Sequence, residues 1–213
     1  MEFISKKLDN YIHAHTEIES PLLYELNRTT NTNVLRPRML SGHFQGRVLS
    51  MFSHMIRPKN VLEIGTYTGY SALCFAEGLS ENGKITTIDK NEELEDLVKE
   101  FISKSDYANK INCVIGNAMD IVPDLNEIYD LVFIDADKSN YINYYTMVID
   151  KVSSGGYIII DNVLWSGKVL EPIKKNDIDT KVLVELNKIV HEDKRVQEVM
   201  LPIRDGLLVV RKK

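Results

Sequence analysis

One stretch of the sequence decides the fold: Val132-Phe133-Ile134-Asp135-Ala136-Asp137-Lys138. Its first three residues have the near-continuous β-branched and aromatic character of a strand that is buried in a parallel sheet. The apolar run then stops at two carboxylates and an amine. Because open α/β sheets bind ligands in the crevice beyond the carboxyl ends of their strands, we expect Asp135 and Lys138 to lie where the chemistry takes place.

A second apolar run, Tyr157-Ile158-Ile159-Ile160, ends in a similar way at Asp161 and Asn162. The two strand ends therefore offer three side chains with oxygen ligands. An acid at one strand end is about as often a helix cap or part of a turn as it is part of a site. Two such ends in one sheet make a purely structural role for both acids less probable.

From Asn60 onward, strand and helix patterns alternate, which is typical of a parallel sheet with helices on both faces. The last two strands are joined by a connection too short for a helical crossover, so we expect them to form an antiparallel hairpin. The expected strands are 60–64, 84–89, 111–115, 130–134, 156–161, 196–201 and 206–211. The expected helices are 70–79, 92–104, 118–123, 139–150 and 179–191.

The part of the chain before this alternation, residues 1–57, is expected to be helical. We interpret it as an N-terminal extension of a core formed by residues 58–213, the whole chain 1–213 being a single domain. Apolar residues at helical spacing and helix-start signals indicate three segments. These are a segment through Phe3, Ile4, Leu8 and Ile12, a segment from Ser20 and Pro21 whose pattern breaks from Asn27 to Pro37, and a segment from Ser41 to Ile56.

Composition and charge favour an enzyme of small molecules. The chain has 213 residues, 44% of them apolar and 27% charged, and a formal net charge of −5. This balance provides no overall attraction for nucleic acid or for an anionic membrane. Cys74 and Cys113 lie in apolar segments and are predicted to be buried free thiols. The N-terminus has charges where a secretory signal needs an apolar core, so a cytoplasmic location is expected.

A glycine loop follows the first strand, in Leu62-Glu63-Ile64-Gly65-Thr66-Tyr67-Thr68-Gly69-Tyr70-Ser71. Glycine is required where the backbone takes a positive φ or lies directly against a ligand. The spacing G-x-x-x-G differs from the G-x-G-x-x-G of pyrophosphate-binding dinucleotide folds, which weakens a reading as an NAD-dependent oxidoreductase. Asp89, at the end of the second strand, is well placed to accept hydrogen bonds from ribose hydroxyls.

Three ordered motifs resemble those of a known family. They are the glycine loop above, the stretch Phe133-Ile134-Asp135-Ala136-Asp137-Lys138-Ser139-Asn140-Tyr141, and Asp161-Asn162-Val163-Leu164-Trp165-Ser166-Gly167. Together they are similar to motifs of the cation-dependent class I O-methyltransferases, the caffeoyl-CoA and catechol O-methyltransferase family. The resemblance runs from about Met39 to Gly206. Arg204 departs from it, because family members often carry a glycine before Asp205-Gly206.

The resemblance implies an α/β, Rossmann-like fold that binds S-adenosylmethionine, with a mostly parallel seven-stranded sheet ordered 3-2-1-4-5-7-6, a C-terminal antiparallel hairpin and N-terminal helices. It also implies a homodimer and a divalent cation, Mg²⁺ or else Mn²⁺ or Ca²⁺. In that strand order the fourth and fifth strands are neighbours, so their terminal acids converge. The implied cofactor-binding residues are Met39, Glu63, Gly65, Tyr67, Ser71, Asp89, Ala118 and Asp135. The implied metal ligands are Asp135, Asp161 and Asn162, the catalytic residues are Lys138 and Asp135, and the candidate substrate contacts are His43 and Trp165.

These residues suit methyl transfer to a catechol, a caffeate or caffeoyl-CoA. Vicinal oxygens bound to a cation lose a proton more easily, as bound water does. Lys138 could take that proton or hold the phenolate, and Trp165 could form a wall for the aromatic ring. Three alternatives remain open: an enzyme that methylates hydroxyuridine in transfer RNA, the NAD-dependent oxidoreductase, and a non-catalytic nucleotide-binding module. We predict a small aromatic substrate, with neither nucleic acid nor membrane as a partner.

Overall fold

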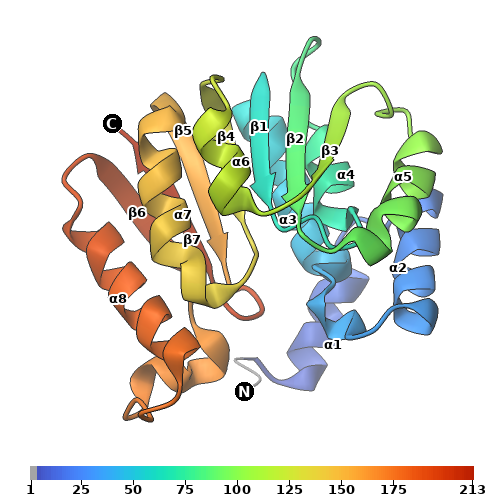
Figure 1. Ribbon diagram of the computed structural model, residues 1–213. Coiled ribbons are helices and arrows are strands. Elements are labelled where there is room, and N and C mark those ends of the chain that lie inside the picture. The colour runs from blue at the N-terminus through green and yellow to red at the C-terminus, as the bar shows by residue number, and fades with distance from the viewer. Residues whose placement is uncertain (1–3) are drawn as a thin grey trace.

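The computed structural model describes residues 4–213, so the predicted helical contribution of Phe3 lies outside the described residues. Its strands form one seven-stranded sheet in the order β3-β2-β1-β4-β5-β7-β6 (Figure 1). The strands are β1 (Asn60–Ile64), β2 (Lys84–Asp89), β3 (Ile111–Ile115), β4 (Tyr129–Ile134), β5 (Val152–Asp161), β6 (Val196–Leu201) and β7 (Leu207–Lys212). Neighbours from β3 to β5 pair in parallel, and β7 pairs antiparallel with both β5 and β6. The predicted fold class, strand order and hairpin are confirmed.

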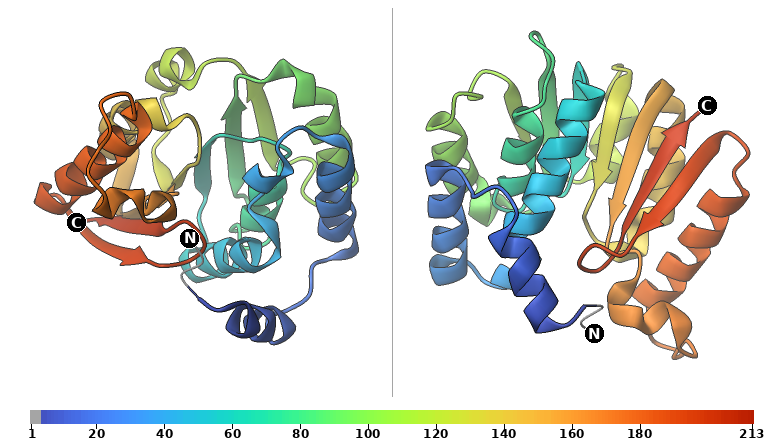
Figure 2. Two further views of the ribbon diagram at one scale, coloured as in Figure 1. Left: turned by 90° about the horizontal axis from the view of Figure 1, so that it is seen from below. Right: turned by 180° about the vertical axis from the view of Figure 1, so that it is seen from behind.

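Helices cover both faces of the sheet. The α-helices are α1 (Lys6–Ala14), α2 (Pro21–Asn33), α3 (Gly42–Ile56), α4 (Tyr70–Ala76), α5 (Glu95–Ser103), α6 (Ala118–Asp124), α7 (Tyr141–Val148) and α8 (Ile178–Glu192). The short 3₁₀ helices are η1 (Pro37–Met39), η2 (Glu92–Leu94), η3 (Lys138–Asn140), η4 (Ile149–Lys151) and η5 (Trp165–Leu170). Figure 1 shows α6, α7 and α8 on one face, and Figure 2 shows α3 on the other.

Alternate residues of the strands enter two hydrophobic clusters, as the period of a strand requires. Leu62 and Ile64 of β1 pack in the cluster under α6, α7 and α8, whereas Val61 packs in the cluster under α2 to α5. The central strands are buried on both faces, which explains why their sequences are apolar runs without alternation. This packing ends at the carboxyl ends of the strands, where the acids begin.

The N-terminal helices share this core. Leu23 and Leu26 of α2 and Leu49 of α3 are buried in the same cluster as Val61. This shared cluster supports the prediction of a single domain, which stays a prediction. None of the helices in residues 4–213 combines the length and the apolar character needed to cross a bilayer.

The expected break between Asn27 and Pro37 is wrong in its position, because α2 continues to Asn33. Polar side chains in this part of the helix turn back to the preceding turn: Asn31 donates to the carbonyl of Asn27 (2.9 Å) and Thr32 to that of Arg28 (3.0 Å). Thr30 is buried and its hydroxyl meets that of Thr68 at 3.2 Å. Tertiary contact thus extends a helix whose own residues favour turns.

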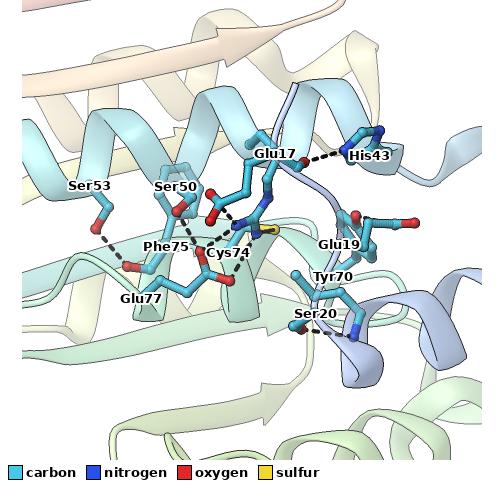
Figure 3. A network of polar contacts seen from close by, with 12 residues as sticks. Glu17, Glu19, Ser20, His43, Ser50, Ser53, Tyr70, Cys74, Phe75 and Glu77 are labelled. Atoms are coloured by element: carbon cyan, nitrogen blue, oxygen red, sulfur yellow. Dashed lines mark hydrogen bonds and ion pairs between the residues drawn. The ribbon is translucent and has the colours of Figure 1, made fainter. Parts of the chain in front are cut away.

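A polar network joins the N-terminal segment to α3 and α4 (Figure 3). Arg47 forms a two-pronged ion pair with Glu77 at 2.9 and 2.8 Å, and its Nη2 also donates to Sγ of Cys74. Burial raises the pKa of the Cys74 thiol well above its ordinary value. Cys74 is therefore a buried free thiol, as predicted, whereas Cys113 is only half-buried and that part of the prediction is wrong.

Candidate active site

The ends of β4 and β5 bring two acids together. Ile134 is in register with Ile160, so Asp135 and Asp161 follow at equivalent positions of neighbouring strands. Asp161 is only 2% exposed. Its Oδ2 accepts a hydrogen bond from Nε2 of Gln45 (2.6 Å), and its Oδ1 accepts one from the backbone N–H of Asn162 (2.6 Å).

The environment of Asp161 disfavours a negative charge. Burial raises the pKa of Asp161 to about 7, and the neighbouring charge of Asp135 adds to this rise. The hydrogen bond from Gln45 and the charges of Arg204 and Lys138 act in the opposite direction. Two acids held close together, of which Asp161 is buried, form a site that a cation would stabilise.

Gln45 is a site residue that the sequence analysis missed. It lies on α3, 116 residues before its partner Asp161, and it is fully buried. Its Oε1 has no hydrogen-bond partner in the described structure, although buried polar atoms are rarely left unpaired. No sequence motif marks this position. The available signal was a glutamine that stands among apolar residues on one face of a predicted helix.

Lys138 lies in η3 with all of its donors engaged. Its Nζ donates to Oδ1 of Asp135 (3.0 Å), to the carbonyl of Ala136 (3.0 Å) and to the hydroxyl oxygen of Tyr141 (2.6 Å). Three acceptors match the three N–H groups of an ammonium. Burial raises the pKa of Tyr141 far above its ordinary value, so this hydroxyl stays neutral. The geometry therefore holds Lys138 as a fixed positive charge beside Asp135.

The glycine loop after β1 lies directly against the acid site. Gly65 has φ = 105°, and a Cβ at this position would stand 1.9 Å from the carbonyl oxygen of Asp135. Its N–H donates to the carbonyl of Ile88 (2.9 Å), and the N–H of Asp135 donates to the carbonyl of Ile64 (2.9 Å). A side chain at Gly65 would thus separate the ends of β1 and β4, which explains the glycine on steric as well as conformational grounds.

Asp89, at the end of β2, organises the other side of the loop. Its Oδ2 accepts from the N–H of Tyr67 (2.7 Å) and its Oδ1 accepts from the N–H of Asn91 (2.9 Å). Tyr67 has a positive φ of 49°. A recess beside these residues is lined by Val98 and Ile115 among others. An acid at the end of the second strand has the character of a residue that binds ribose hydroxyls.

Glu63 of β1 is the most deeply buried acid near the loop. Burial raises the pKa of Glu63 to about 8, and the neighbouring hydroxyls of Ser71 and Thr87 oppose this rise. The Thr87 hydroxyl donates to Oε2 of Glu63, whereas Oε1 has no partner in the described structure. Ser71 belongs to the first turn of α4, so a single cluster joins β1, β2 and α4.

The remaining predicted site residues differ in their burial and in the groups that they contact. Ala118 is buried with Ile88 in the cluster under α6. Trp165 has φ = 46°, packs against the same cluster and buries its Nε1 without a partner in the described structure. Met39 is 52% exposed on η1. His43 is turned to the N-terminal segment, where one ring nitrogen contacts the carbonyl of Glu17 at 2.6 Å (Figure 3). The other ring nitrogen lies 3.2 Å from Nδ1 of His13.

Metal-ligand clusters of the more common kind are not found. Within residues 4–213, no three side chains of the types His, Cys, Asp and Glu are grouped to hold a metal ion. The predicted set contains two carboxylates and one amide, so it is not a cluster of that kind. Its assignment as a metal site stays a prediction.

Comparison with known proteins identifies the family. A family model described as O-methyltransferase matches residues 13–213. The chain belongs to the O-methyltransferase family. Caffeoyl-CoA O-methyltransferase 1 of Arabidopsis thaliana is 38% identical over 185 residues, which cover 82% of this chain and 71% of the relative. Caffeoyl-CoA O-methyltransferase of Stellaria longipes is 33% identical over 224 residues, which cover 98% of this chain and 91% of the relative.

Solved structures of this family superimpose over nearly the whole chain. The O-methyltransferase of Bacillus cereus in complex with SAH has a TM-score of 0.89 at 26% identity, covering 97% of each chain. The SAH-bound methyltransferase PaMTH1 of Podospora anserina has a TM-score of 0.89 at 25% identity, covering 100% of this chain and 98% of that one. The resemblance drawn from the three motifs is confirmed, and so is the prediction of an S-adenosylmethionine-dependent O-methyltransferase.

Proposed function

We propose that this O-methyltransferase transfers the methyl group of S-adenosylmethionine to one hydroxyl of a vicinal dihydroxy aromatic, with the help of a divalent cation. The observation that carries the proposal is the crowding of Asp135 and Asp161 at neighbouring strand ends, beside Lys138 and the unpaired Oε1 of Gln45. The curated relatives that act on caffeoyl-CoA by name support the substrate class.

The residues present fit a hard cation. Asp135, Asp161 and Asn162 provide oxygen donors, and two carboxylates neutralise one divalent ion. Gln45 adds a buried carbonyl oxygen that no hydrogen bond satisfies. When bound, Mg²⁺ or Mn²⁺ would lower the pKa of a coordinated hydroxyl and would hold two vicinal oxygens in place.

Residues around the glycine loop fit the methyl donor. Asp89 retains acceptor capacity for ribose hydroxyls beside its contact with Tyr67, and Ala118 lines the side where the base would lie. Glu63, Gly65, Tyr67 and Ser71 are proposed to line the methionine part, and Met39, half-exposed on η1, is proposed to contact the cofactor as well. In the reaction the S–CH₃ bond breaks and an O–CH₃ bond forms, so that S-adenosylhomocysteine leaves, and the acceptor hydroxyl gives its proton to solvent water.

Lys138 is best suited to hold the ionised oxygen of the acceptor. Its ammonium is fixed by Asp135, Ala136 and Tyr141, so its positive charge stands at a defined point. To act as a base, Lys138 would first have to give up at least one of these three hydrogen bonds. We therefore assign it an electrostatic role, in which it stabilises negative charge on oxygen before the attack on the methyl group.

Trp165 is proposed to contact the aromatic acceptor, because it follows Asp161 and Asn162 in the chain and an indole is a suitable wall for a flat ring. His43 would have to turn away from Glu17 and His13 to make the same contact. We also propose the homodimer that the family resemblance implies and a cytoplasmic location. Light scattering of the purified chain tests the dimer.

The proposed function is tested by a methyl-transfer screen of purified protein with S-adenosylmethionine. The acceptors are catechol, caffeate, caffeoyl-CoA and tRNA that contains hydroxyuridine, each with Mg²⁺ and with chelator. We expect transfer to a vicinal dihydroxy aromatic that chelator abolishes and Mg²⁺ restores. Efficient transfer to tRNA alone, or full activity in chelator, would contradict the proposal.

A further inference from the structure

The turn between β6 and β7 forms a bridge between two loops at the rim of the site. On one side, the backbone N–H of Leu164 donates to the carbonyl of Asp205 (2.9 Å), and that of Val163 donates to the carbonyl of Gly206 (3.2 Å). A Cβ on Gly206 would lie 2.9 Å from the nitrogen of Leu164, so the two segments are in close backbone contact. The turn is thereby fixed to the loop that follows Asp161.

On its other side, the same turn reaches the segment before α3 through a single side chain. Nη1 of Arg204 donates to the carbonyls of Leu40 (2.8 Å) and Ser41, and Nη2 donates to the carbonyl of Arg38 (3.4 Å). These contacts span more than 160 residues of sequence. Charged donors form stronger hydrogen bonds than neutral ones, and the planar guanidinium fork suits several acceptors at once.

The backbone of Arg204 has a conformation that glycine adopts more easily than arginine. Its φ is 50°, in the left-handed region that glycine adopts without strain and other residues adopt at a cost. A glycine would therefore suit the turn better on conformational grounds. The arginine must contribute through its side chain, and its only hydrogen bonds within the described residues are those to segment 38–41.

Segment 38–41 leads directly into the helix that carries Gln45. Ser41 is the N-cap residue of α3, and its side chain makes no capping hydrogen bond. Gln45 lies one turn further on, with its Nε2 2.6 Å from Oδ2 of Asp161. The start of this helix thus has no local side-chain cap, and Arg204 anchors the residues just before it.

We propose that Arg204 is a positioning residue for the acceptor half of the site: it fastens segment 38–41 to the β6–β7 turn and so holds Gln45 against Asp161. This inference rests on the proposed function in so far as Gln45 and Asp161 serve cation and acceptor binding. The fastening itself is a property of the fold that can be measured without any turnover.

The test compares Arg204→Gly and Arg204→Lys with Arg211→Ala. Arg211 is a matched control, because it lies on the same hairpin and donates to Gln197 at 3.2 Å, away from the acids. In Arg204→Gly we expect faster amide hydrogen exchange in 38–45 with little change in 162–166, where the backbone contacts remain. Mn²⁺ affinity, followed by electron paramagnetic resonance, should fall roughly tenfold. The kcat/KM for the acceptor should fall by a similar factor through a higher KM, while amide exchange in the strands of the sheet stays unchanged. Arg204→Lys should give an intermediate effect.

Unchanged exchange in 38–45, or a uniform increase in exchange across the sheet, would overturn the inference. The first result would mean that the hydrogen bonds are dispensable, and the second that Arg204 acts on the whole fold. If the wild-type protein methylates no acceptor, the exchange and Mn²⁺ measurements still decide whether Arg204 fastens the segment. Failure of the proposed function and failure of this inference are therefore distinguishable.

Discussion

Replacement of Glu63 by glutamine should make the protein more stable at alkaline pH. Burial raises the pKa of Glu63 from 4.5 to about 8, so the folded state keeps a proton that the unfolded state releases. The contribution of this group to stability is therefore fully present below about pH 4.5 and is lost as the pH rises to about 8. The loss corresponds to roughly 5 kcal/mol at most, since one pKa unit is about 1.4 kcal/mol and solvent relaxation reduces the effect. Glu63→Gln removes the titration and retains an acceptor for the Thr87 hydroxyl.

The assay is the melting temperature of wild type and Glu63→Gln between pH 5 and pH 9, without S-adenosylmethionine. Because other titrating groups are common to both proteins, the difference in Tm isolates Glu63. We expect a difference near zero at pH 5 that grows to roughly 5–10 °C in favour of the variant at pH 9, at about 2–4 °C per kcal/mol. Glu171→Gln, at an exposed position, should show no such growth. A difference in Tm that does not change with pH would refute the raised pKa of the buried Glu63.

Three further predictions concern the proposed site. Lys138→Ala should lower kcat by about 10²-fold or more without loss of SAH affinity, as measured by steady-state kinetics across pH. Lys138→Arg should keep part of the activity, because it retains the positive charge. A wild-type kcat for Lys138→Ala would contradict a role of Lys138 in the reaction. Asp161→Asn should raise the Mg²⁺ concentration that gives half-maximal rate more than tenfold, with little effect on SAH affinity measured by calorimetry. Equal losses of Mg²⁺ response and SAH affinity would point to a structural role for Asp161. The rate of catechol methylation should change little between low and physiological salt, because acidic residues outnumber basic residues by 31 to 26. A steep fall of activity with salt, together with measurable tRNA binding, would favour an enzyme that acts on tRNA.

The central strands could be predicted from the sequence because each one is an apolar run that ends sharply. The expected bounds of β1, β2, β3 and β6 coincide with those observed. β5 begins earlier than expected, at Val152, because Ser153-Ser154-Gly155-Gly156 has little strand preference of its own and is extended by pairing of Val152 with Tyr129. Long-range pairing therefore added residues that local preference did not indicate.

The acids of the candidate site could also be predicted, since strand ends in a parallel sheet meet at one edge. The approach of Gln45 could not, because it depends on how α3 crosses the sheet, and no residue near Gln45 encodes that placement locally. The same is true of Arg204, which was visible as a departure from the family pattern but whose partners are more than 160 residues away. Side chains that act across layers of the fold become apparent only when the layers are assembled.

The most direct test of the proposed chemistry is the rate of methyl transfer to a catechol as Mg²⁺ is titrated into chelator-treated protein, measured beside an analogue with a single hydroxyl. The proposal predicts no transfer without Mg²⁺, a saturable rise for the catechol, and little or no transfer to the analogue, because two vicinal oxygens are needed at the cation held by Asp135 and Asp161. Equal rates for both acceptors, or a catechol rate that does not respond to Mg²⁺, would contradict it.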